Sequence, residues 1–64
     1  MLRNAPPPGT PVRFLQEVRK AKAYDTGTLV RPLGTYLTES ANDQFEVDFR
    51  GERITVTRAQ IEEA

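Results

Sequence analysis

Sixty-four residues with nine basic and nine acidic side chains, and with no cysteine, histidine or tryptophan, narrow the functions open to this chain. A chain of this length makes one domain, whose small core leaves little volume for an enclosed ligand pocket. The cysteine and histidine that form disulfides, zinc sites and most nucleophile–base pairs are absent, and zero net charge disfavours a dedicated nucleic-acid binder. We therefore expect a non-catalytic protein that binds another protein through its surface, without a cofactor, a metal or a small-molecule substrate.

Nothing in the sequence suggests a membrane segment or an export signal. No run approaches the ~20 apolar residues that a membrane-spanning helix needs. Residues 1–11 carry one arginine and lack the apolar segment of a secretory signal. Together with the absence of cysteine, these observations predict a cytoplasmic protein that does not contact membranes.

Residues 1–11 contain four prolines and show no hydrophobic periodicity. Proline fixes φ and lacks an N–H donor, so this segment cannot join the centre of a sheet. We expect an extended, partly disordered lead-in to a barrel domain that covers residues 12–64. A polyproline ligand segment is the alternative.

The first strand is expected over residues 12–16, where Val12 and Phe14 alternate with Arg13. A long, irregular, basic loop follows, centred on residues 19–22. Helical spacing of the apolar residues leaves a short helix as an alternative there.

Residues 27–37 have the pattern of a strand that bends in its middle. Residues 28–31 favour a strand. Pro32 has no N–H to donate to a strand ladder, so it places a kink or a sheet edge there. Gly34 permits a turn or a bulge. Strand-like chemistry resumes over residues 35–37. A bent strand is what a very small barrel needs to wrap around its own core.

The clearest pattern is a hairpin over residues 44–57, where apolar and polar residues alternate on both strands. With Gly51 and Glu52 as loop residues, glycine comes first, as a type II′ turn requires. That register pairs Arg50 with Arg53, Phe49 with Ile54, Asp48 with Thr55, and Val47 with Val56. It places the apolar residues on one face and the charged residues on the other.

The chain continues with a capping-box pattern at Thr57 and Gln60. A short helical turn over residues 58–63 is expected, with Ile61 directed to the core. The order of strand, long loop, bent strand, hairpin and terminal turn predicts an all-β fold, a small SH3-like barrel of about five short strands.

Charge is divided unevenly along the chain. Residues 1–36 carry six basic and two acidic side chains, and residues 37–64 carry three basic and seven acidic ones. Separate faces would make the molecule dipolar and steer it toward an acidic partner. We expect instead that the strands interleave and that the two sets largely cancel.

Three side chains are candidates for surface recognition. Tyr24 lies beside the basic loop, Tyr36 follows a Gly-Thr turn, and Arg31 lies near Tyr36 along the bent strand. Aromatic residues on a shallow barrel face commonly anchor peptides. Ordinary packing is the competing interpretation and the favoured one for Tyr24, since a small barrel uses most of its aromatics in its core.

The bent strand carries a family resemblance. The stretch from Gly27 to Leu37, GTLVRPLGTYL, resembles a G-x-V-R-x-V-G-T-F-L stretch of the NifZ family of nitrogen-fixation accessory proteins. Residues 9–12, 45–49 and 53–61 are similar to other strands of that family. The chain departs from the family in a shorter segment over residues 20–25, in the lack of the frequent cysteine in the final strand, and in a missing double arginine before the central strand.

The resemblance implies a chaperone-like accessory protein without its own cofactor, which helps the P-cluster of the nitrogenase molybdenum–iron protein to form. The binding residues that it suggests are Arg31, Gly34, Thr35, Tyr36 and Leu37. The basic loop adds Lys20, Lys22 and Tyr24 as candidates.

Two other functions remain open on the sequence. A small barrel subunit of a ferredoxin-dependent or photosynthetic electron-transfer complex would use the basic loop to dock an acidic ferredoxin. A nucleic-acid-binding barrel would use Arg13, Lys20, Lys22 and Arg31 on one face, but zero net charge disfavours this role.

Overall fold

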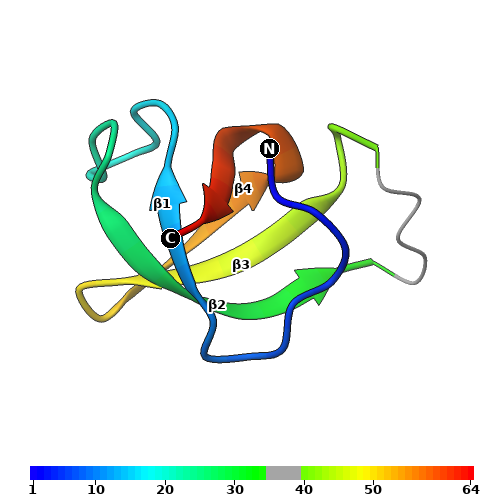
Figure 1. Cartoon of the computed structure of the whole chain (residues 1–64). Helices are drawn as coiled ribbons and strands as arrows, with labels where there is room; N and C mark the ends of the chain where they lie inside the picture. The colour runs from blue at the N-terminus through cyan, green and yellow to red at the C-terminus, as the bar shows by residue number, and fades with distance from the viewer. Residues whose placement is uncertain (35–39) are drawn as a thin grey trace.

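The computed structural model describes residues 1–34 and 40–64. The described chain is nearly all β, with one five-stranded antiparallel sheet in the order β4-β3-β2-β1-β5 and a single 3-10 turn, η1 (Figure 1). The elements are β1 (Pro11–Phe14), β2 (Thr26–Leu33), β3 (Gln44–Phe49), β4 (Glu52–Thr57), η1 (Arg58–Gln60) and β5 (Ile61–Glu63). The predicted all-β, SH3-like barrel is confirmed.

Strand β2 wraps the sheet around the core because it pairs with different strands at its two ends. Its first residues pair with β1 and its later residues with β3, and the register shifts between Leu29 and Arg31. The predicted bend is therefore a bulge that precedes Pro32, and Pro32 itself stays in the strand opposite Phe45.

Close approach of strands at the start of β2 depends on Gly27. A Cβ atom there would lie 2.8 Å from the main-chain oxygen of Asp48 and 2.9 Å from a methyl carbon of Val47. Only glycine leaves room for β2 to cross β3 at this distance.

The β3–β4 hairpin turns at Arg50 and Gly51, whereas the sequence suggested Gly51 and Glu52, so the expected register is wrong by two residues. Arg53 consequently pairs with Asp48. Both turn residues have positive φ, +53° and +85°, as a type I′ turn requires. The side-chain period of a strand is two, so this shift leaves every side chain on its predicted face.

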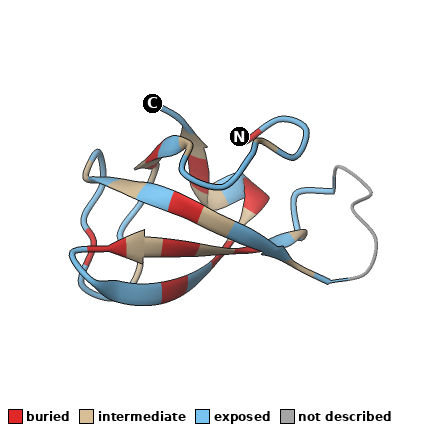
Figure 2. Ribbon diagram, turned by 90° about the horizontal axis from the view of Figure 1, so that it is seen from below, coloured by how far each residue is buried: buried red, intermediate tan, exposed pale blue. Residues whose placement is uncertain are grey.

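Buried residues alternate with more exposed ones along β3 and β4 (Figure 2). Because successive side chains of a strand point to opposite faces, the buried side chains share the inner face of the curled sheet. The Phe14 and Phe49 rings meet edge to face, with centroids 5.6 Å apart and planes at 80°. The apolar core consists of Leu2, Val12, Phe14, Ala21, Leu29, Phe45, Val47, Phe49, Ile54, Val56 and Ile61.

The lead-in over residues 1–11 packs on the barrel, and the expectation of a partly disordered tail is wrong. Leu2 belongs to the buried core, and its N–H donates to the carbonyl of Arg58 at 3.1 Å. Leu29 in β2 donates its N–H to the carbonyl of Thr10 at 2.9 Å. The lead-in thus extends the β1–β2 pairing despite its prolines.

The C-terminal segment differs from the expected helical turn over residues 58–63. Only Arg58–Gln60 form a 3-10 turn, which the Gln60 side chain closes by accepting the Thr57 N–H at 2.8 Å. Ile61–Glu63 form β5, which pairs with β1. Ile61 is buried, as predicted.

Candidate functional site

The loop between β1 and β2, residues 15–25, is built around a tight turn instead of being irregular. Val18 and Ala21 exchange two main-chain hydrogen bonds of 2.9 and 3.0 Å. Ala21 is fully buried and Val18 packs against the core, so both anchor the turn to the barrel. Arg19 and Lys20, at the tip of the turn, are held out in solvent.

Tyr24 combines an exposed ring with a left-handed main chain. Its side chain is 75% exposed and its φ is +72°, a conformation that costs a residue with a Cβ atom about 1–2 kcal/mol. The Tyr24 N–H donates to the carbonyl of Phe14 at 2.7 Å, and the Asp25 carboxylate accepts the Lys22 N–H at 2.9 Å. The loop therefore holds the ring in solvent, and the favoured expectation that Tyr24 packs in the barrel is wrong.

Arg19, Lys20, Lys22 and Tyr24 together form what we call the loop patch. All four are exposed. Lys20 approaches Glu52 only to 3.8 Å with its side chain 82% exposed, and such a pair contributes little to stability. Among the described residues, Arg19 and Lys22 form no ion pair. The cations of the loop patch are thus available to a partner.

A shallow depression of about 360 Å³ connects the loop patch to the tip of the β3–β4 hairpin. The Arg50 guanidinium lies over the Phe49 ring at 5.0 Å from its centroid. The lining residues are Lys20, Phe49, Arg50, Gly51 and Glu52. The depression therefore adds a cation and part of an aromatic ring to the surface around Lys20.

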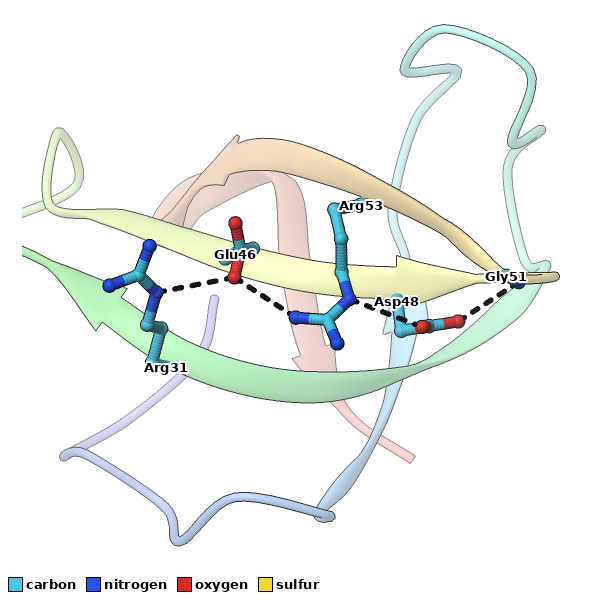
Figure 3. A network of polar contacts seen from close by, with 5 residues as sticks. All are labelled: Arg31, Glu46, Asp48, Gly51 and Arg53. Carbon is cyan, nitrogen blue, oxygen red and sulfur yellow. Dashed lines mark hydrogen bonds and ion pairs between the residues drawn. The ribbon is translucent and has the colours of Figure 1, made fainter.

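Arg31, a predicted binding residue, belongs to a different surface. Its Nε donates to Glu46 at 3.2 Å, and Glu46 also accepts from Arg53 at 3.2 Å. Arg53 in turn pairs with Asp48 at 3.3 Å, and the Asp48 carboxylate accepts the Gly51 N–H (Figure 3). Because the Arg31 guanidinium is engaged across its own sheet, Arg31 is less available than Lys20 or Lys22.

The remaining residues of the predicted site are only partly described. Gly34 follows β2 with a φ of +139°. Thr35, Tyr36 and Leu37 lie outside the described residues. Lys20, Lys22 and Tyr24 are therefore exposed on one loop, whereas Arg31 lies on β2 and pairs with β3.

Arg58 is a buried cation whose role the sequence analysis missed. Its guanidinium donates to the Asp43 carboxylate at 3.0 and 3.2 Å and to the carbonyls of Leu2 at 3.0 Å and Asn4 at 2.7 Å. It also lies over the Phe45 ring at 5.1 Å. We call this group the arginine clamp, because it ties the lead-in to the segment before β3. No spacing in the sequence distinguishes Arg58 from an exposed residue of the capping turn.

Ion pairs join the basic first half of the chain to the acidic second half. Arg13 pairs with Glu62 at 3.1 Å, Arg31 with Glu46 at 3.2 Å, and Lys20 approaches Glu52. Strands of the two halves are neighbours at the β2–β3 and β1–β5 contacts. The two sets of charges therefore cancel in part, as expected from interleaved strands, while Arg19 and Lys22 form no ion pair among the described residues.

Over residues 1–34 and 40–64, no cluster of carboxylate side chains could hold a metal ion. The same part of the chain contains no helix with the length and apolarity to cross a membrane.

Comparison with family models, with curated proteins and with solved structures found no match to this chain. The resemblance to the NifZ family thus depends on the quoted motif, of which residues 35–37 lie outside the described part.

Proposed function

We propose that this chain is a non-catalytic binding module that docks on an acidic surface of a partner protein through the loop patch. The observation that carries the proposal is Tyr24, whose ring stands 75% exposed on a left-handed main chain among three exposed cations. Local strain of this kind persists where the surrounding structure imposes it, and it concentrates at functional sites.

Stability alone does not account for tyrosine at this position. Glycine or asparagine adopts a φ of +72° at lower cost, and an exposed ring gains little from the barrel. Tyrosine is enriched at the buried centres of protein interfaces, where its ring supplies apolar area and its hydroxyl a hydrogen bond. A partner that covers Tyr24 would supply the burial that the barrel does not.

The cations of the loop patch specify the charge of the partner. Lys20 lies at the tip of the turn, Lys22 follows the turn before Tyr24, and Arg50 lines the adjoining depression. Complementary charge raises association rates and disfavours wrong partners, and its effect falls as salt is added. We therefore propose carboxylate-rich partner surfaces.

The family resemblance supplies one candidate partner. A NifZ-like role would make this chain a cytoplasmic accessory protein that binds the nitrogenase molybdenum–iron protein during P-cluster maturation. Gly34 and residues 35–37 of the motif would then form a second contact, beside Arg31. The resemblance supports this assignment, and the exposed loop patch is consistent with an accessory binder.

The exposed cations also favour a second candidate, a barrel subunit that docks ferredoxin in an electron-transfer complex. Lys20 and Lys22 would make the acidic contacts in that complex. The two candidates differ in the protein that they bind and share the loop patch.

A pull-down from nitrogen-fixing cells, analysed by mass spectrometry, tests the proposal. Recovery of the molybdenum–iron protein supports the accessory role, and recovery of ferredoxin or a reductase subunit supports the second candidate. Either capture should be lost with Tyr24→Asn and with the double variant Lys20→Gln/Lys22→Gln. Arg3→Gln, which removes an exposed cation from the lead-in, is the matched control and should retain the partner.

Capture that survives both loop variants would contradict the loop patch as the docking surface. Retention of the partner by the loop variants with loss on Tyr36→Ala would move the site to the motif of residues 27–37.

A further inference from the structure

The two edge strands of the sheet are protected to different degrees. Strand β5 has three residues, two of them glutamates, whereas β4 has six residues, Glu52–Thr57, without proline or bulge. Short edges, charges and bulges are the devices that keep sheet edges from pairing with other chains. Edge β4 is twice as long, and its charges are confined to its first two residues, Glu52 and Arg53.

The main-chain groups of β4 that face away from the sheet can be assigned from the register. Phe49 and Glu52 flank a two-residue turn, so they form a hydrogen-bonded pair, and such pairs recur at every second residue. Arg53 and Thr55 therefore direct their N–H and C=O groups outward. Among the described residues, these N–H and C=O groups of Arg53 and Thr55 form no main-chain hydrogen bond outside the strand ladders.

The open part of this edge is limited at its C-terminal end. Thr57 is the next outward residue, and its N–H already donates to the Gln60 side chain at 2.8 Å. The open edge therefore consists of the main-chain groups of Arg53 and Thr55.

Arg53, the basic residue of β4, does not place its charge at the open edge. The Arg53 side chain lies back over its own sheet, with its guanidinium bonded to Glu46 at 3.2 Å and Asp48 at 3.3 Å (Figure 3). These contacts direct the charge away from the outward face of β4 and largely neutralise it. Thr55, the other open residue, is exposed and β-branched, which favours strand pairing.

We propose that β4 pairs with β4 of a second copy of this chain, antiparallel about a two-fold axis at Ile54. In this register Arg53 faces Thr55 of the second copy, so each open N–H meets an open C=O and no two like charges are directly opposed. Zero net charge on each copy removes overall repulsion. A continuous sheet across two barrels results, in the isologous arrangement that two-fold symmetry demands.

The pairing is independent of the loop patch, and the protein alone tests it. Sedimentation velocity and ¹H–¹⁵N spectra would be recorded from about 10 μM to about 1 mM, a range that covers weak association. We expect a monomer–dimer equilibrium, with the amide signals of Arg53 and Thr55 shifting most as concentration rises. A monomer throughout the range, or shifts centred on residues 19–24, would overturn the proposal.

Thr55→Pro removes the outward donor without removing a donor to β3, and Thr55→Ala is its control because it keeps the N–H. We expect Thr55→Pro to weaken dimerisation at least tenfold and Thr55→Ala to change it less than threefold, with circular dichroism showing that both fold. Undiminished dimerisation by folded Thr55→Pro would overturn the proposal. Tyr24→Asn should dimerise as the natural chain does, so failure of this pairing and failure of the docking surface are distinguishable.

Discussion

Cationic side chains have opposite environments in the arginine clamp and the loop patch. Arg58 is 1% exposed, and its guanidinium contacts the Asp43 carboxylate, two carbonyls of the lead-in and the Phe45 ring. Lys20 is 82% exposed and has one long ion pair. A buried cation must be satisfied internally, because leaving it unpaired is expensive. An exposed one costs the fold little, and its position is free to serve recognition.

The same contrast applies to the aromatic residues. Phe45 and Phe49 fill the core and each lies beneath a guanidinium, whereas Tyr24 contributes its ring to solvent. We therefore expect the clamp to contribute mainly to stability, whereas the proposed function assigns binding to the loop patch. Substitutions in the two regions should separate these two properties.

The largest loss of unfolding free energy is expected for a substitution in the arginine clamp. Arg58→Ala leaves the Asp43 carboxylate, itself only 9% exposed, without its guanidinium and frees two carbonyls of the lead-in. Breaking a buried pair in this way costs about 3–5 kcal/mol, which is most of the stability of a chain this small. Urea unfolding followed by circular dichroism measures it. A loss under about 1 kcal/mol would contradict a structural role for the clamp.

The next largest loss of stability is expected for a substitution at Gly27, where β2 crosses β3. Gly27→Ala places a methyl group 2.8 Å from the Asp48 carbonyl oxygen, and overpacking of this kind costs about 1–3 kcal/mol. Thr28→Ala, an exposed neighbour on the same strand, is the control for urea unfolding. Equal midpoints for the two variants would show that the strands separate easily at this crossing.

Tyr24→Asn tests the division between stability and binding. Asparagine tolerates positive φ better than tyrosine does, so we expect the free energy of unfolding to stay unchanged or to rise by up to about 1 kcal/mol. Partner capture should nevertheless fall. A variant that is destabilised as well would show that the ring supports the fold.

The smallest loss of stability is expected for a substitution at Arg31, on the exposed face of the sheet. Arg31 is 65% exposed and pairs with Glu46, which is 19% exposed. Ion pairs at a protein surface contribute about 0.2–1 kcal/mol. Arg31→Ala should lower the unfolding midpoint slightly, and 0.5 M salt should reduce the difference from the natural chain. A large effect would mean that the network of Arg31, Glu46, Arg53 and Asp48 stabilises the fold cooperatively.

Alternation along Phe45, Val47 and Phe49 was sufficient to predict the hairpin and its apolar face. Its turn could not be placed, because Arg50 adopts a positive φ that its residue type does not favour. The order of elements indicated the barrel, but β5 was missed because three residues after a capping turn carry too little pattern.

The candidate site was only partly predictable. Lys20, Lys22 and Tyr24 were identified from composition, yet exposure of the Tyr24 ring depends on main-chain geometry that the sequence does not display. Burial of Arg58 depends on contacts with Leu2 and Asp43, which lie far from it in the chain. Long-range contacts of this kind have no local signal.

The most direct test of the docking surface compares the affinity of the captured partner for the natural chain and for Tyr24→Asn, by isothermal titration calorimetry at low salt. We predict at least a tenfold loss of affinity with an unchanged or higher unfolding midpoint. Equal affinities for the two folded proteins would contradict the assignment of binding to the loop patch.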